Sequence, residues 1–220
     1  MPRVLHTFHS TSELFDRYYR EVDQRQIESF NRNLAGEFRE RLEQLDWLLE
    51  RIRQLELQGE TILSRSQRIS EAHLDRIERE GLDWEKEPMP PGAKLTAEEG
   101  RAWLDIEFEM KLLTESFYYI AGRARAIARH REEPLPGLRT FEAEGVRNVR
   151  NHLIEHPEGS PSRVFLLSWA WGGPQGPVIK AIRHVGQQDV FPDPGLYRNA
   201  AQFRDRLEAL LRATLHTYGV

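Results

Sequence analysis

The stretch "GVRNVRNHLIEHPEG", residues 145–159, concentrates side chains that could bind an anion and move a proton. It contains two Arg-Asn pairs and two of the eight histidines of the 220-residue chain. A histidine titrates near neutral pH and can donate or accept a proton, while an arginine can hold a phosphate through two parallel hydrogen bonds. The candidate site residues are Arg147, Arg150, Asn151, His152 and His156. Three interpretations of them compete.

The first interpretation is a metal site. His152 and His156, with Glu155 between them, spell H-x-x-E-H, the inverted zinc-protease signature, and residues four apart share a helix face. Such enzymes need a further acidic ligand far downstream, and Pro157 would truncate the helix that holds the two histidines. The acids that follow the motif are Glu158, Asp189, Asp193, Asp205 and Glu208. We therefore expect neither a metal nor any other cofactor.

The second interpretation is structural. Arg147 and Arg150 could pair with Glu144, Glu155 or another helix, and the second histidine could cap the helix before the proline. This alternative assigns no chemistry to the motif.

The third interpretation is chemistry on phosphate, and here the motif resembles the HEPN family (higher eukaryotes and prokaryotes nucleotide-binding). Members are helical bundles marked by an arginine, a polar residue directly after it and a histidine a few positions further on. The resemblance covers residues 96–157. It implies metal-independent RNA cleavage at a site assembled from both subunits of a homodimer, in a toxin or defence setting that can include a neutralising protein partner. It equally allows a catalytically silent module that binds RNA, nucleotide or a protein.

The motif offers two pairings of arginine with histidine. Arg147 precedes His152 by five positions and Arg150 precedes His156 by six, which are about 140° and 120° apart around a continuous helix. Neither pair meets without a break in the backbone. Pro157 disfavours α conformation at the residue before it, so the second pair is favoured. Arg150 would then hold the phosphate, Asn151 would orient it, and His156 would transfer the proton.

The remaining sequence predicts a mainly α protein in which a HEPN-like helical bundle carries an inserted β-hairpin and a long N-terminal helical hairpin. Residues 1–93 are expected to form that N-terminal hairpin or, alternatively, a long bent helix, with an interruption at Gly59. Its start has a capping-box spacing, Ser10 with Glu13. Apolar residues recur at helical intervals in Phe38, Leu42, Leu45, Leu49 and Ile52.

Residues 94–220 are expected to form the bundle and to make one compact unit with the first part. Thr96 and Glu99 predict the start of a central helix, and Thr140 predicts a short helix that carries the motif. Leu104, Phe108, Leu112 and Tyr119 are expected to cover an adjoining buried face of the central helix. The β-hairpin is expected over residues 163–185, followed by a C-terminal helix marked by Phe203, Leu207, Leu210 and Leu211.

Charge and composition limit the setting. The net charge is −4, yet residues 123–150 hold seven arginines against four acids, so polyanion binding would be local. The chain has no cysteine and no continuous apolar run of membrane-spanning length. We expect a cytoplasmic protein without a membrane partner, and RNA as the candidate ligand.

Overall fold

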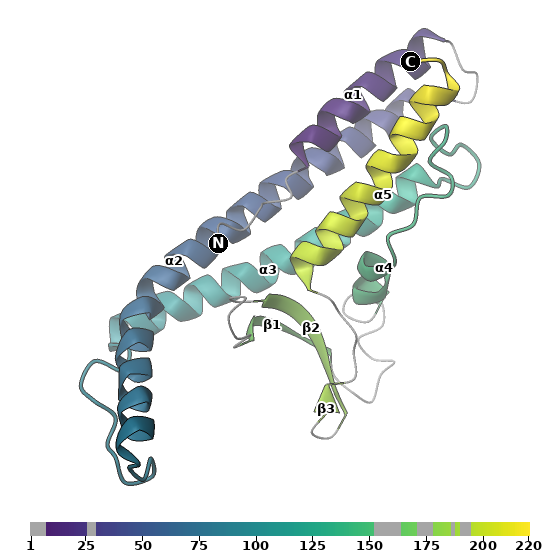
Figure 1. The fold of residues 1–220 in the computed structure, drawn as a ribbon. Coiled ribbons are helices and arrows are strands. Elements are labelled where there is room, and N and C mark those ends of the chain that lie inside the picture. The colour runs from purple at the N-terminus through teal and green to yellow at the C-terminus, as the bar shows by residue number, and fades with distance from the viewer. Residues whose placement is uncertain (1–7, 26–29, 152–163, 171–177, 186–187, 190–194) are drawn as a thin grey trace. The chain divides into compact units, whose positions relative to one another are not determined.

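The computed structural model describes residues 8–25, 30–151, 164–170, 178–185, 188–189 and 195–220, and these are mainly helical, as predicted (Figure 1). The helices are α1 (His9–Gln24), α2 (Arg32–Glu80), α3 (Ala97–Ala128), α4 (Glu144–Arg150) and α5 (Leu196–Thr217). The strands are β1 (Val164–Ala170), β2 (Val178–Val185) and β3 (Gln188–Asp189). In these described ranges, no helix has an apolar window long enough to cross a membrane.

Contacts divide the chain into two compact units. The first comprises Met1–Glu50 and Lys111–Val220, and the second comprises Arg51–Met110. Both α2 and α3 contribute to both units. The boundary expected from the sequence, between residues 93 and 94, falls inside the second unit.

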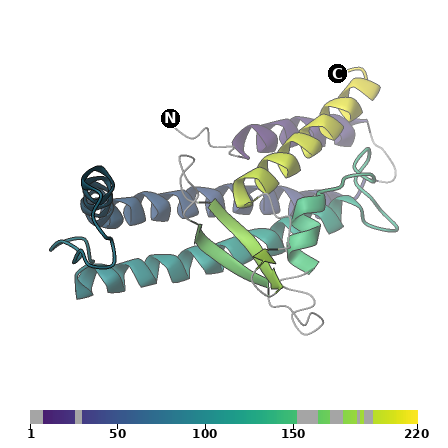
Figure 2. The ribbon, with the colours of Figure 1, turned by 60° about the horizontal axis from the view of Figure 1, so that its bottom comes forward.

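In the first unit, α5 packs beside α1, as Figures 1 and 2 show. Aromatic rings join these helices to the segment before α4. The ring of Phe203 in α5 lies 5.6 Å from that of Phe8 and 4.9 Å from that of Phe141, both edge-on. All three side chains are fully buried. Edge-to-face aromatic pairs contribute free energy in addition to that gained by burying their surface. These three rings therefore stabilise the packing of the C-terminal helix on the rest of the unit.

Helices α1 and α2 form a helical hairpin. The rings of Phe15 and Phe38 are 4.9 Å apart, and the backbone N–H of Phe8 donates to Oδ1 of Asp46 over 2.9 Å. The predicted apolar series in α2 is buried at every position: Phe38, Leu42, Leu45, Leu49 and Ile52.

One of the two predicted capping boxes forms. At the start of α3, the Thr96 N–H donates to Glu99 over 2.8 Å, and the Glu99 N–H donates to Oγ1 of Thr96 over 3.2 Å. The box predicted at Ser10 was wrong, because α1 begins earlier, with Phe8 as its N-cap. The Ser10 hydroxyl instead donates to Glu208 of α5 over 3.2 Å.

In the second unit, Gly59 does not interrupt the helix, contrary to the sequence prediction. Helix α2 continues through it to Glu80 and ends before Gly81, which adopts a left-handed φ of 62°. A Cβ at Gly59 would lie 2.7 Å from the ring of Trp103 in α3. The glycine therefore lets the ring of Trp103 pack directly on the backbone of α2. This packing explains why a residue of low helix propensity occurs inside the helix.

The second predicted face of α3 is not buried. Leu104, Phe108, Leu112 and Tyr119 are 61%, 64%, 48% and 55% exposed. The opposite face is the core side, and its fully or largely buried residues include Ile106, Met110, Phe117, Ala124 and Ile127. The prediction that α3 is surrounded by other helices was wrong, because apolar residues on the outer face made an amphipathic helix resemble a central one.

The strands lie within or just beyond residues 163–185, where a hairpin was expected. β1 pairs with β2 in antiparallel register, with Val164 opposite Arg183 and an irregularity between Leu167 and Ala170. β3 pairs with the end of β2, and β2 contacts α5.

The two α2 glycines should respond oppositely to alanine. A Cβ at Gly36 meets nothing within 4 Å, so Gly36→Ala should stabilise the protein by up to about 1 kcal/mol through helix propensity. Gly59→Ala should gain nothing or destabilise, because its methyl group would press on the Trp103 ring. Thermal unfolding followed by circular dichroism measures both variants. Equal stabilisation by both would contradict the Gly59–Trp103 packing.

Candidate functional site

The motif begins on α4, a helix of seven residues that is held by apolar contacts. Val146 and Val149, three residues apart, are each only 1% exposed. The helix starts later than predicted, with Ala143 rather than Thr140 as its N-cap. Residues between Thr140 and Ala143 stay outside the helix, and the carboxylate of Glu142 there pairs with Arg125 of α3 and with Arg129.

Two glycines set how closely α4 packs. A Cβ at Gly122 of α3 would collide with the side chain of Arg150, so that side chain lies directly on the α3 backbone. A Cβ at Gly145 would collide with the amide of Asn199 in α5. The Asn199 Nδ2 group donates to the Tyr118 hydroxyl over 2.9 Å, and both side chains are buried. Helices α3, α4 and α5 therefore meet here. We call this contact region the α3–α4 seam; it comprises residues 118–129, at the end of α3 and just after it, residues 142–150 and Asn199.

The seam gathers positive charge. Arg125 donates from Nε and Nη2 to the two carboxylate oxygens of Glu142 over 2.8 and 3.0 Å, and Arg129 also pairs with Glu142. Burial lowers the pKa of the Arg125 guanidinium, and the positive charge of Arg147 lowers it further. Arg147 thus lies close enough to Arg125 for the two like charges to interact unfavourably. An arrangement that crowds guanidinium groups is suited to an anion, which would relieve the repulsion.

The predicted site residues are placed as follows. Arg147 is exposed on α4, and Arg150, at the last position of α4, is half-buried. Arg147 lies near Arg125 of α3, and Arg150 lies over Gly122 of α3. Each pair of positions is three residues apart in its own helix. Asn151 follows as the C-cap in helical conformation, with φ −62° and ψ −38°. The structure thus brings Arg147 and Arg150 onto one neighbour, α3.

His152 and His156 lie outside the described residues, so their positions relative to Arg150 stay predictions. Within the ranges that the structure describes, no group of three or more His, Asp or Glu side chains is arranged to hold a metal ion.

Sequence reasoning missed the residues that position α4. Gly122 lies in the interior of α3, and a glycine inside a helical pattern is a signal of a packing role. Asn199 precedes Phe203, Leu207 and Leu211 at four-residue intervals, so it is a polar residue on an apolar stripe. That pattern predicts a buried polar side chain that needs a hydrogen-bond partner. Its partner, Tyr118, could not be identified without the fold.

Comparison of the chain with family models, with curated proteins and with solved structures gives no match.

The Tyr118 hydroxyl should contribute measurably to stability, and the neighbouring tyrosine provides a matched control. Tyr118→Phe leaves the buried Asn199 Nδ2 group without this acceptor and should lower the free energy of unfolding by about 1–2 kcal/mol. Tyr119→Phe removes the same atom from a side chain that is 55% exposed and should change stability by less than about 0.5 kcal/mol. Urea denaturation compares the two. Similar effects of both substitutions would contradict the structural role of the Tyr118–Asn199 bond.

Proposed function

We propose that the chain is a HEPN-like protein that cleaves RNA without a metal ion, with Arg150 and Asn151 on the scissile phosphate and His156 as the proton-transfer group. The observation that carries the proposal is the gathering of arginines at the α3–α4 seam, where Arg147 lies close enough to act on the charge of Arg125 and the side chain of Arg150 lies over Gly122. The fold adds a second support, because the motif is carried by a helix packed in a helical unit, as the HEPN resemblance implies.

The arginines differ in what they can do. Arg125 is committed to Glu142 through two hydrogen bonds, so it contributes positive potential rather than a free hydrogen-bonding edge. Arg147 is exposed and is the more accessible of the two α4 arginines. The side chain of Arg150 lies over Gly122, in the space that a Cβ there would occupy. A guanidinium held at this position could stabilise negative charge that develops on a phosphate beside it.

The proposed reaction uses the ribose as its own nucleophile. His156 removes the proton from the 2′-hydroxyl, and the 2′-oxygen forms a bond to the adjacent phosphorus. The bond from phosphorus to the 5′-oxygen of the next nucleotide breaks, and that oxygen takes up a proton. Arginine offsets the additional negative charge of the five-coordinate phosphorane. The products are a 2′,3′-cyclic phosphate and a 5′-hydroxyl end.

The alternative pairing, Arg147 with His152, belongs to the same proposal. Arg147 is the more exposed arginine, whereas the Arg150 pairing has Pro157 to break the helix near its histidine. Single substitutions of the two histidines distinguish these pairings.

A catalytically silent HEPN-like module that binds RNA, nucleotide or a protein is the second candidate. It is favoured by a specific observation: the side chain of Arg150 is half-buried on α3, and Arg125 and Arg129 are paired with Glu142. These contacts hold the segment before α4 and α4 itself in place whether or not catalysis occurs. Such a module would bind phosphate with the same seam and leave RNA intact.

Cleavage of a 5′-labelled RNA in excess chelator tests the proposal. Arg150→Ala and His156→Ala should each reduce the rate by at least roughly a hundredfold, the usual contribution of a proton-transfer or charge-stabilising group. Arg123→Ala is the matched control, because Arg123 follows Gly122 directly but is exposed and faces Glu37 of α2 over 3.4 Å. It should retain activity. An oligonucleotide with a 2′-deoxyribose at the cleavage position should resist, and the 3′ product end should be a cyclic phosphate.

Binding and stability measurements separate the two candidates. Arg150→Ala should weaken RNA binding, whereas His156→Ala should leave binding nearly unchanged, since a neutral histidine adds little to phosphate affinity. A parent protein that binds RNA and never cuts it would reject the enzyme in favour of the silent module. A His156→Ala variant that unfolds well below the parent would instead identify the histidine as a helix cap.

A further inference from the structure

The exposed face of α3 is symmetric about Phe108. A leucine lies four residues before Phe108 and another lies four residues after it. Three residues away, an acid precedes Phe108 and a base follows it; seven residues away, a base precedes it and an acid follows it. In chain order these are Arg101, Leu104, Asp105, Phe108, Lys111, Leu112 and Glu115. At equal distances before and after Phe108, an apolar residue is matched by an apolar residue, and a charged residue is matched by one of opposite charge.

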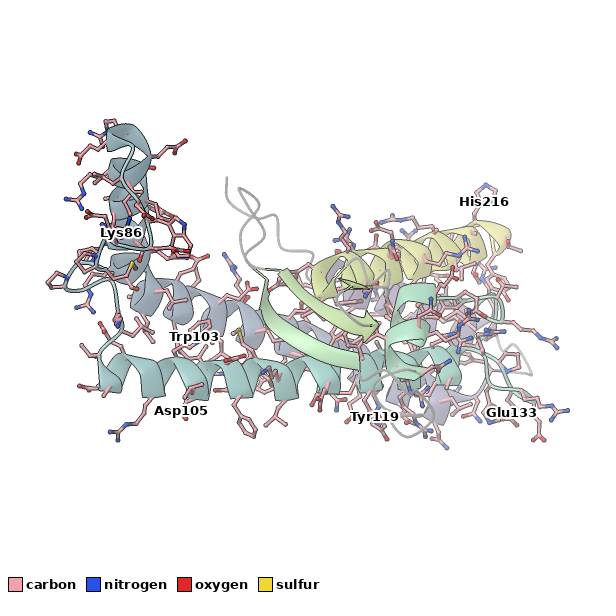
Figure 3. The ribbon with its side chains drawn as sticks, turned by 90° about the horizontal axis from the view of Figure 1, so that it is seen from below. Lys86, Trp103, Asp105, Tyr119, Glu133 and His216 are labelled. Carbon is pink, nitrogen blue, oxygen red and sulfur yellow. The ribbon has the colours of Figure 1, made fainter. Side chains whose placement is uncertain are left out.

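Helix geometry places these positions on one face. Separations of three, four and seven residues return to nearly the same side of an α-helix, and α3 is continuous from Ala97 to Ala128. Phe108 is 64% exposed, and Arg101 and Glu115 are exposed as well. In Figure 3, Asp105 projects from the side of α3 opposite to Trp103, the residue that packs on Gly59. All seven residues of the pattern lie on one continuous helix, so the regular geometry of α3 fixes their spacing.

We infer that this face of α3 binds the same face of a second copy of the chain, antiparallel, about a two-fold axis at Phe108. In that arrangement a residue a given number of positions before Phe108 meets the residue the same number after it in the other copy. Arg101 then faces Glu115, and each such pair occurs twice. A parallel arrangement would instead oppose identical charges.

The apolar part of the pattern matches in the same register. Leu104 meets Leu112 of the second copy on both sides of the axis, and Phe108 meets its own equivalent at the centre. Burying these three exposed side chains is favourable, and the flanking charge pairs fix direction and register. Asp105 and Lys111 add a further opposite-charge pair. The interface would supply the homodimer that the proposed function calls for, but it rests on the α3 pattern and not on RNA chemistry.

Charge exchange tests the register. The parent chain should be a dimer at micromolar concentration by sedimentation equilibrium. Arg101→Glu places two acids opposite each other at both ends of the axis and should weaken dimerisation by roughly tenfold or more. The double variant Arg101→Glu with Glu115→Arg should restore the parent affinity, because the pairs are exchanged and not removed. A monomeric parent, or a double variant no better than Arg101→Glu alone, would overturn the inference.

Cross-linking tests the axis, and the absence of cysteine from the sequence makes the result unambiguous. Phe108→Cys puts a thiol on the two-fold axis, so mild oxidation should convert most of the protein to a covalent dimer. Leu104→Cys is the control, because its two copies would be about 12 Å apart along the helices, beyond disulfide reach. Equal cross-linking of both variants, or none of Phe108→Cys, would contradict the axis. RNA cleavage is measured on the same samples, so loss of dimerisation and loss of catalysis are scored separately.

Discussion

The close approach of α4 to α3 at Gly122 is the constraint on which the candidate site depends. A side chain at position 122 would occupy the space that Arg150 fills, so the glycine allows that arginine to lie directly on the α3 backbone. The other end of α4 is fixed by Gly145 against Asn199, whose amide is bound to Tyr118. A helix of seven residues has little stability of its own, so these contacts and its two buried valines must hold it.

Helix α3 serves two separate purposes. Its inner face carries apolar core residues and, near its C-terminal end, Arg125 of the seam. Burial lowers the pKa of Arg125, the positive charge of Arg147 lowers it further, and Glu142 accepts two hydrogen bonds from the same guanidinium. Perturbed charged groups gather at binding and catalytic sites, which is why the seam carries our functional proposal. The outer face of α3 carries an apolar pattern with a symmetry that a second copy would match.

Periodicity predicted the mainly helical class, the buried series from Phe38 to Ile52 and the capping box at Thr96, because each is a local property of the chain. It failed where a residue has a tertiary role. Gly59 was expected to break a helix and instead accommodates Trp103, and the short helix was expected to start at Thr140 but starts after Ala143, while Glu142 pairs with Arg125. The motif was visible in the sequence. Gly122 and Asn199, which position it, left a local signal, but Tyr118 becomes recognisable as the partner of Asn199 only when helices α3 and α5 are brought together.

Arginine side-chain NMR tests most directly the claim that the seam is a phosphate site. Titration with a nucleoside 3′-monophosphate should shift the Nε–Hε resonances of Arg147 and Arg150, which flank the proposed position of the phosphate, and leave that of Arg123 unchanged. The shifts should saturate and should weaken as salt is added, because the contact is ionic. Shifts of equal size at all three arginines, or none at Arg147 and Arg150, would contradict the account.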